Sequence, residues 1–229
     1  SLYADFLANI DKTFGDFHLT ANVGASRYHT SMDQLYIAGD LVIPNFFQIN
    51  NINFSANYKP DPTGYEDEIQ SIFASAELSW KNQLYLTVTG RNDWDSKLAF
   101  SKQKSFFYPS VGLSALLSEM VKLPEVISYA KIRGSYTVVA SSFDRFLTNP
   151  GYEYNSQTHN WANPTVYPMD NMKPEKTKSW EIGLNLKFWG NRFNLDATYY
   201  RSNTLNQTFK VDIPSSSGYK QAIVQAGNG

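Results

Sequence analysis

Apolar and polar residues alternate with a period of two along much of the chain, whereas the 3.6-residue period of an amphipathic helix is nearly absent. In residues 17–26, for example, Phe17 and Leu19 fall on one face, and His18 and Thr20 fall on the other. The same alternation recurs in residues 2–10, 17–26, 72–80, 84–91, 107–117, 130–138, 180–188 and 193–200. The pattern therefore predicts about eight strands, each with one apolar and one polar face.

The connections between these strands alternate between short and long. Short turns with Gly or Asn near their centres are expected at 11–16, 81–83 and 189–192, and 118–129 has room for one helical turn that ends before Pro124. The long connections are 28–68, 92–106 and 141–179. Alternate connections of an antiparallel meander lie at the same end of the sheet, so we expect all short turns on one side and all long loops on the other.

This combination is typical of an outer-membrane β-barrel, whose strands are apolar toward lipid and polar toward the lumen, with short periplasmic turns and long extracellular loops. Aromatic residues also cluster near both ends of the predicted strands, as they do in the two interfacial girdles of such barrels. They are Phe14, Phe17, Trp80, Tyr85, Phe188, Trp189 and Phe193 beside the turns, and Trp94, Phe106, Phe107, Tyr108, Tyr199 and Tyr200 at the other ends. The sequence predicts an all-β chain that forms a segment of a transmembrane antiparallel β-barrel.

A soluble β-sandwich that acts as a carbohydrate-binding module is the alternative, because its strands also alternate and its core face is also apolar. Two features favour the barrel. Sandwiches rarely collect their long loops at one end, and their strands are usually about 5–6 residues long, shorter than most of these.

The charge balance and the cysteine count exclude further classes of function. With 20 Lys plus Arg against 21 Asp plus Glu, the net charge of −1 gives no support to a nucleic-acid partner. The absence of cysteine excludes disulfides, cysteine-bound zinc and thiol catalysis. No apolar run approaches the roughly 18 residues of a membrane-spanning helix, and the first residues do not resemble a signal peptide but the middle of a strand. We therefore interpret the 229 residues as about a third of a barrel.

The search for chemistry gives no catalytic constellation, so the sequence predicts neither an enzyme nor a cofactor. The histidines His18, His29 and His159 have no metal-ligand spacing. Asp61 and residues 66–68 place four carboxylates on the first long connection, where calcium is conceivable but a solvated loop is the better interpretation.

Aromatic side chains among amides on the long connections are the candidate ligand contacts, because rings offer apolar faces and amides offer directional hydrogen bonds. The four candidates are Trp94, Tyr152, Tyr154 and Trp161. The competing interpretation is that these rings only pack the loops together.

Several stretches resemble TonB-dependent outer-membrane transporters. Residues 173–184, KPEKTKSWEIGL, are similar to the entry into a late barrel strand of that family, and residues 191–200 resemble the turn and return strand that follow. Residues 217–219 with 225–228 resemble the approach to the next strand. The stretches similar to the SusC/RagA branch of Bacteroidetes nutrient importers are 85–94, 107–114 and 131–136.

The resemblance implies a larger, 22-stranded barrel in the outer membrane of a Gram-negative, Bacteroidetes-like cell. It also implies an N-terminal plug, energy supplied through TonB, a SusD-like surface lipoprotein as lid, and an oligosaccharide or peptide as substrate. Residues 1–229 would then be part of a single barrel domain, with the plug and the C-terminal strands outside this chain. Arg91 and Glu181 would face the lumen.

Overall fold

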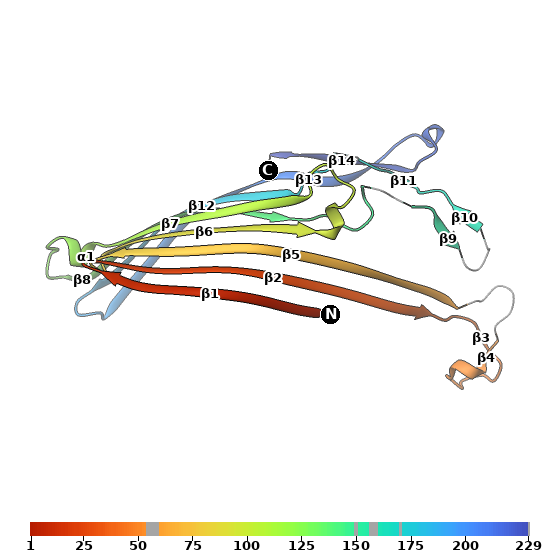
Figure 1. Cartoon of the computed structure of the whole chain (residues 1–229), viewed down its shortest axis with the longest axis horizontal. Coiled ribbons are helices and arrows are strands. Elements are labelled where there is room, and N and C mark those ends of the chain that lie inside the picture. Colours follow the sequence, from red (N-terminus) through yellow and green to blue (C-terminus); the bar gives the residue numbers. More distant parts are fainter. Residues whose placement is uncertain (54–59, 149–150, 156–159, 170, 229) are drawn as a thin grey trace.

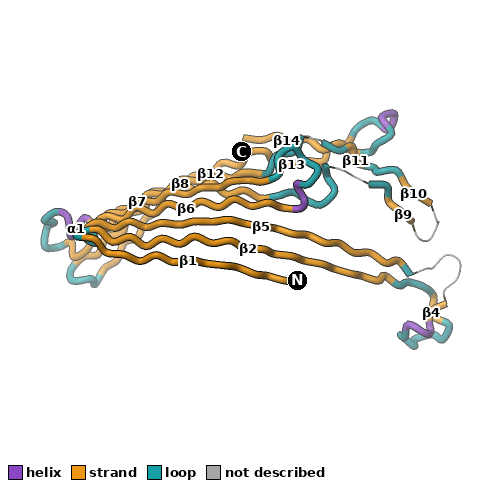
Figure 2. The backbone as a smooth tube through the Cα atoms, viewed as in Figure 1, coloured by secondary structure: helices purple, strands orange, loops and turns teal. Residues whose placement is uncertain are grey.

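The structure is a computed structural model, and it describes residues 1–53, 60–148, 151–155, 160–169 and 171–228. Its principal strands are β1 (Leu2–Phe14), β2 (Phe17–Tyr36), β5 (Asp61–Trp80), β6 (Leu84–Asp95), β7 (Ser105–Leu116), β8 (Ile127–Ser141), β12 (Glu175–Phe188), β13 (Phe193–Asp212) and β14 (Gln221–Asn228). These strands follow one another as antiparallel neighbours in one curved sheet (Figures 1 and 2). The predicted meander is therefore confirmed.

Smaller elements decorate the sheet. The short strand β11 (Val166–Tyr167) adds to β14 in parallel. The other small elements are β3 (Asp40–Leu41), η1 (Ile49–Asn51), β4 (Ile52–Asn53), η2 (Ser96–Leu98), α1 (Leu117–Met120), β9 (Glu153–Asn155), β10 (Asn160–Ala162) and η3 (Ser215–Ser217). Strand β3 pairs with β4, and β9 pairs with β10, as two separate small sheets. Helix α1 is the helical turn predicted before Pro124.

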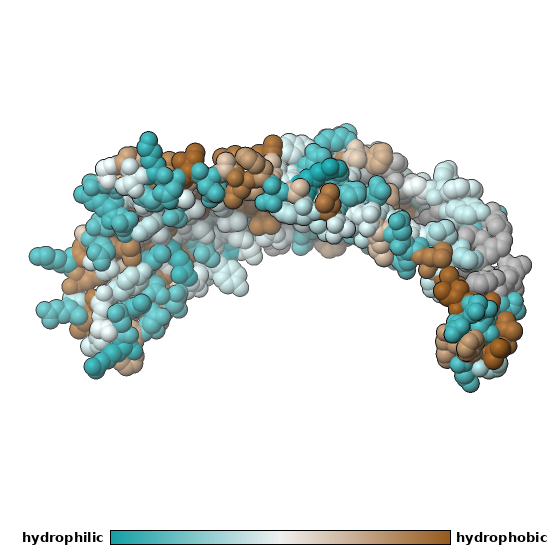
Figure 3. All heavy atoms as spheres, turned by 60° about the horizontal axis from the view of Figure 1, so that its bottom comes forward, coloured by the Kyte–Doolittle hydropathy of each residue, from teal (hydrophilic) through white to brown (hydrophobic). Residues whose placement is uncertain are grey.

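Strand pairing collects apolar side chains on one face of the sheet, which we call the apolar face, and polar side chains on the other, the polar face. Next to the short turns, Phe14, Phe17, Trp80, Leu84 and Ala115 form one row across five strands of the apolar face. Many side chains of this face stay exposed in the isolated chain, and the whole molecule has the outline of an arch (Figure 3). The same face continues across β8, β12 and β13 through Ile132, Leu184 and Ala197, so the apolar faces predicted for the eight stretches are confirmed.

The β-sandwich alternative requires a second large sheet over the apolar face. In the described ranges, the main sheet is accompanied only by the two-stranded sheets β3–β4 and β9–β10. The structure therefore contradicts the sandwich.

Three strands are much longer than the alternation predicts. Strands β2, β5 and β13 have 20 residues each. The ladder between β2 and β5 continues without interruption from the pair Phe17–Trp80 to the pair Tyr36–Asp61, so much of the predicted loop 28–68 is strand. Alternation ends earlier than pairing because backbone groups can pair along a hairpin whether or not one of its faces is apolar.

The tight turns keep the predicted residue types. Gly15 between β1 and β2 has a φ of 59°, and Gly190 and Asn191 between β12 and β13 have φ values of 64° and 68°. Glycine adopts this left-handed region without strain and asparagine adopts it more readily than most residues. The alternation pattern did not predict β14, which is a ninth long strand where about eight were expected.

The polar face is held together by side chains that cross between strands. Arg133 of β8 extends over Gly183 of β12 to reach β13, where its Nη2 donates to Thr198 Oγ1 at 2.8 Å and to Asp196 Oδ1 at 3.4 Å. Asn185 donates to the other oxygen of Asp196 at 2.9 Å. A Cβ at Gly183 would lie 2.5 Å from Arg133 Nε, so this glycine leaves the path open for the arginine.

Buried apolar side chains occur within the wall, at Phe106, Ala130, Val138 and Ile223, and also among the long connections. The largest side chains with no appreciable exposure are Leu98, Ser101, Met172 and Pro174, all on or beside the long connections. Pro174 comes directly before β12, as expected of a proline at a position that donates no ladder hydrogen bond. The loops therefore form a packed cap over one end of the sheet.

One arginine ties this cap to a distant strand. Arg145 follows β8, and its Nη1 donates to Asp67 Oδ2 of β5, while its guanidinium lies 3.5 Å from the centroid of the Tyr65 ring. Strands β6 and β7 lie between β5 and β8 in the sheet. Since the β5–β6 ladder ends at the pair Ile69–Asp95, the connection reaches Asp67 across the ends of these two strands.

Replacing Gly183 with Ala in the full-length parent protein should displace Arg133 and lower the free energy of unfolding, because the hydrogen bonds of Arg133 to Thr198 and Asp196 are lost. The matched control is Gly112→Ala, since a Cβ there meets nothing closer than 4.0 Å. Unfolding of both variants in detergent, followed by heat-modifiable migration, checks this. Equal stabilities of the two variants would contradict the role assigned to Gly183.

Replacing Arg145 with Ala should release the connection after β8 and raise its rate of cleavage by an added protease about tenfold or more. A partly buried charged hydrogen bond contributes about 1.5–3 kcal/mol, and that energy opposes local opening. Limited proteolysis of the parent protein measures the rate, with Arg201→Ala of β13 as control. An unchanged rate would show that Asp67 does not hold the loop.

Candidate functional site

The connection between β8 and β12 forms a pocket of about 480 Å³ within the cap. Its lining combines apolar side chains with one guanidinium. The lining residues are Arg145, Phe146, Leu147, Gly151, Tyr152, Pro164, Thr165 and Val166. The predicted contact Tyr152 therefore lies in a concave site, where a bound molecule would meet an aromatic ring beside a fixed positive charge.

Phe146 holds an unusual backbone conformation in this pocket. Its φ is 62°, a left-handed value that bulky residues rarely adopt, and its side chain is 66% exposed. Arg145 directly before it is anchored on Asp67 and Tyr65, and this contact fixes the chain at the strained residue. Strained residues of this kind concentrate at binding sites.

The predicted contacts Tyr154 and Trp161 form a pair on the β9–β10 hairpin. They are opposite each other in the ladder, and their ring centroids are 5.0 Å apart. Both rings are also widely exposed, Trp161 to 68%. A tilted pair of exposed rings offers an apolar platform for a flat or ring-shaped group.

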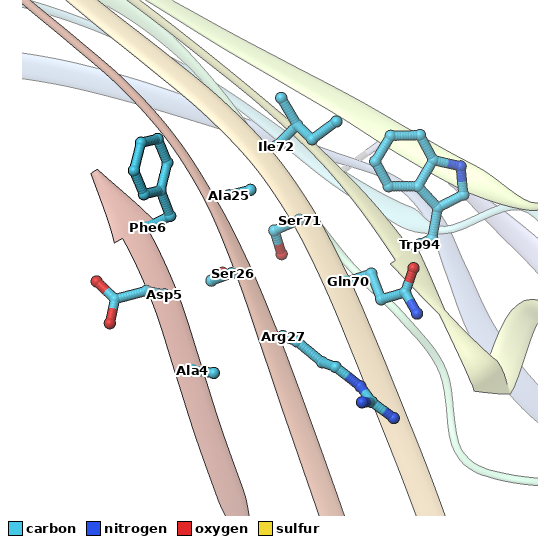
Figure 4. A pocket seen from close by; sticks show the side chains of 10 residues that line it. All are labelled: Ala4, Asp5, Phe6, Ala25, Ser26, Arg27, Gln70, Ser71, Ile72 and Trp94. Carbon is cyan, nitrogen blue, oxygen red and sulfur yellow. The ribbon is translucent and has the colours of Figure 1, made fainter. Parts of the chain in front are cut away.

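Trp94 does not join the other three. It belongs to the apolar face, directly opposite Gln70 of β5, in the same alternation as Leu86 and Val88. It borders a separate depression with Phe6 and Ile72 (Figure 4). Even-numbered residues of β6 lie on the apolar face, and Trp94 is one of them. The sequence alone therefore already separated Trp94 from the aromatic residues of the loops.

Of the residues that line the loop pocket, only Tyr152 was a predicted contact, and Arg145 and Val166 show why the others were missed. Arg145 was not singled out, because its partner Asp67 is 78 positions away in the chain. The short strand β11 brings Val166 to β14 through only two paired residues, too few to give a periodic pattern. The one sequence feature that could have drawn attention to Arg145 is its place, with Asp144, between the aromatic residues Phe143 and Phe146.

The polar face beneath the cap contains a charged cluster around Arg91, as predicted for this residue. Its Nε donates to Asp93 Oδ1 at 2.7 Å and its Nη2 donates to Ser71 Oγ at 2.8 Å. Tyr108 donates to the other oxygen of Asp93 at 2.6 Å, and the guanidinium lies 5.6 Å from the centroid of the Phe73 ring. Glu181 also belongs to this face, between Ser135 and Tyr200.

The acidic stretch considered for calcium lies on a strand and not on a loop, which corrects the prediction. Successive residues of β5 point to opposite faces, so Asp67 contacts Arg145 on the polar face and Glu68 contacts Arg27 on the apolar face. Their carboxylates therefore cannot converge on one cation. Within the described ranges, no group of three or more His, Asp or Glu side chains could hold a metal ion, and His159 lies outside those ranges.

No helix among the described residues is long and apolar enough to cross a membrane.

Curated relatives of similar sequence come from Formosa agariphila. TonB-dependent receptor P3 is 25% identical over 228 residues, and TonB-dependent receptor P39 is 24% identical over 235 residues. These alignments cover 95% and 96% of this chain but 22% of each relative. The chain thus spans about a fifth of the length of these curated relatives.

Solved structures share the fold. A structure of the RagAB peptide transporter superimposes with a TM-score of 0.80 at 16% identity, over 96% of this chain and 25% of that one. The siderophore receptor PirA from Pseudomonas aeruginosa superimposes with a TM-score of 0.58 at 13% identity, over 99% of this chain and 36% of that one.

The family described as "TonB dependent receptor-like, beta-barrel" matches residues 2–228, nearly the whole chain. The meander, the segregation of its two faces and the long connections at one end agree with that assignment. This chain belongs to the TonB-dependent receptor β-barrel family.

Proposed function

We propose that this chain forms part of the barrel wall and the extracellular loops of an outer-membrane importer that takes up glycan or peptide oligomers. The observation that carries the proposal is the arrangement of three surfaces. A polar, hydrogen-bonded face lies beneath a loop pocket with exposed aromatic side chains, and the opposite face of the same wall is apolar. Such a wall suits lipid on one side and a hydrophilic cargo on the other.

Substrate capture is assigned to the cap. The Tyr154–Trp161 pair and the pocket that contains Tyr152 and Phe146 belong to one connection, so an extended oligomer could contact both. Rings beside amide and guanidinium donors suit sugar rings and peptide side chains alike. The substrate then passes along the polar face, where the cluster of Arg91, Asp93 and Tyr108 offers hydrogen bonds.

The remaining parts of the importer are assigned to regions outside this chain. We place residues 1–229 within a single barrel domain, with a plug that couples to TonB and with further strands that close a 22-stranded wall. RagAB, one of the structural relatives, is named as a peptide transporter. That relative supports a two-component importer in which a SusD-like surface lipoprotein covers the barrel. The family consists of receptors and transporters, which supports transport and not catalysis as the activity.

Location follows from the family and from the apolar face. We assign the parent protein to the outer membrane of a Gram-negative, Bacteroidetes-like cell, with lipid against the apolar face. The Formosa relatives support this assignment.

The test is a double substitution, Tyr154→Ala with Trp161→Ala, in the full-length parent protein. It should weaken binding of the oligomeric substrate about tenfold, because two exposed rings at one contact contribute at least 1–2 kcal/mol. Uptake of the labelled oligomer by intact cells, together with its binding to the purified protein, measures the effect.

Trp94→Ala is the matched control, since it removes an aromatic residue of the same wall from the apolar face. Substrate affinity should stay unchanged in this variant. If the double variant binds as tightly as the parent protein, the hairpin is not the capture site. If Trp94→Ala alone weakens binding, the substrate contacts the opposite side of the wall.

A further inference from the structure

The apolar face carries a depression that the proposed import route does not use. It measures about 440 Å³ and extends over four adjacent strands, β1, β2, β5 and β6. Figure 4 shows the rings of Phe6 and Trp94 on opposite sides, with the small side chain of Ala25 between them. The depression exists because alanines occupy positions 4 and 25, where larger side chains would fill the space.

Two rows of cross-strand neighbours define the depression, and their chemistry differs. The row nearer the short turns consists of Phe6, Ala25 and Ile72 and is wholly apolar. The next row outward consists of Ala4, Arg27, Gln70 and Trp94 and is polar and aromatic. The depression is therefore amphipathic along the strand direction, with its apolar half toward the middle of the wall.

The polar row lies at the height where the apolar band of a barrel ends. From Trp80 to Gln70, strand β5 rises by about 33 Å at about 3.3 Å per residue. A strand tilt of about 40° reduces this to about 25 Å, which is the usual height of the lipid-facing band. The head group of an outer-leaflet lipid would therefore lie level with Arg27 and Gln70, and its chains would lie level with Ala25 and Ile72.

The polar groups at this height form one hydrogen-bonded set with balanced charge. Arg27 Nε and Nη2 donate to the two carboxylate oxygens of Glu68 at 3.0 and 2.7 Å, and Gln70 Nε2 donates to Glu68 Oε1 at 2.6 Å. His29 Nδ1 lies 3.8 Å from Glu68. The Arg27 side chain remains 57% exposed in spite of this pairing.

This chemistry selects among head groups. A phosphate needs a net positive charge, which the Glu68 carboxylate cancels here. Sugar hydroxyls both donate and accept, so they match a surface on which guanidinium, amide and carboxylate groups alternate. The Trp94 ring at the rim adds an apolar platform against which the C–H face of a sugar can pack.

The apolar half continues toward the middle of the wall as low relief. On the same face, Ala74 and Ala76 of β5 and Ala21 of β2 follow Ala25, with Val23 beside Ala74 as the one larger side chain among them. An acyl chain that starts beside Ala25 can lie along this alanine track.

We propose that this depression is a binding site for an outer-leaflet glycolipid. Its sugar head group contacts Arg27, Glu68, Gln70 and Trp94, and one acyl chain lies over Ala25. The proposal depends on the membrane position of the wall but not on which substrate the importer carries. Transport and lipid binding can therefore fail independently in experiments.

The test uses the full-length parent protein in nanodiscs of phosphatidylethanolamine that contain a small fraction of diglucosyl diacylglycerol. Lipid that stays bound after release from the disc is counted by native mass spectrometry. Ala25→Phe should fill the apolar half, and Arg27→Ala should remove the bidentate donor. Each variant should lower the bound glycolipid about tenfold, the loss expected when about 1.4 kcal/mol of binding energy disappears.

Three controls keep the result interpretable. Arg201→Ala removes an outward-facing arginine of β13 and should leave glycolipid binding unchanged. Arg27→Lys keeps a positive charge and loses the bidentate geometry, so it should bind as weakly as Arg27→Ala. Heat-modifiable migration and substrate uptake should remain at the parent level in Ala25→Phe, which shows that the barrel is folded.

Three outcomes would overturn the proposal. The first is glycolipid retention in Ala25→Phe and Arg27→Ala equal to that in Arg201→Ala. The second is equal retention of phosphatidylglycerol and diglucosyl diacylglycerol by the parent protein, which would show that the site does not recognise the sugar head group. The third is binding of the free diglucoside as tight as that of the lipid, which would show that the acyl chain does not contribute to binding.

Discussion

Backbone pairing between neighbouring strands is the constraint on which the rest of this structure depends. Lipid offers no partner for a free N–H or C=O group, so a wall that lies in it must satisfy each of these groups within the sheet. The ladders from β1 to β13 do this with few irregularities, and the pair β2–β5 alone aligns 20 residues of each strand. Once the register is fixed in this way, the face on which each side chain lies follows from whether its residue number is odd or even within the strand.

The two faces of the wall therefore carry different side chains and make different interactions. On the polar face, Arg133 crosses from β8 to Asp196 of β13, whereas Arg91 pairs with Asp93 of its own strand and reaches Ser71 of β5. The apolar face needs no such partners over most of its height, and its first charged hydrogen-bonded set, around Arg27, comes where the apolar band ends. Few apolar side chains are buried inside the chain, and the two with no exposure, Leu98 and Met172, lie in the loop cap.

The features predicted correctly from the sequence are those that depend on residues close together in the chain. Alternation gave the faces of the eight strands, and Gly15 and Asn191 marked turns because few residues adopt their left-handed φ. Sequence reasoning failed in the outer half of the β2–β5 hairpin, because a ladder can continue there with no alternation. It also failed for the loop pocket, since the contact between Arg145 and Asp67 joins distant residues through the tertiary fold alone. Trp94 lies on the apolar face with Leu86, which its even residue number already indicated, and it remains an untested prediction as a ligand contact.

The confinement of all tight turns to one end has an evolutionary consequence. Because Gly15 with Asp16 and the turn at residues 189–191 fix the register from that end, the opposite connections can gain, lose or exchange residues with no slip between strands. Insertions and deletions can therefore accumulate in the long connections of a lineage, while the inherited wall remains the same. The wall thus serves as a constant frame for connections that vary in length and sequence.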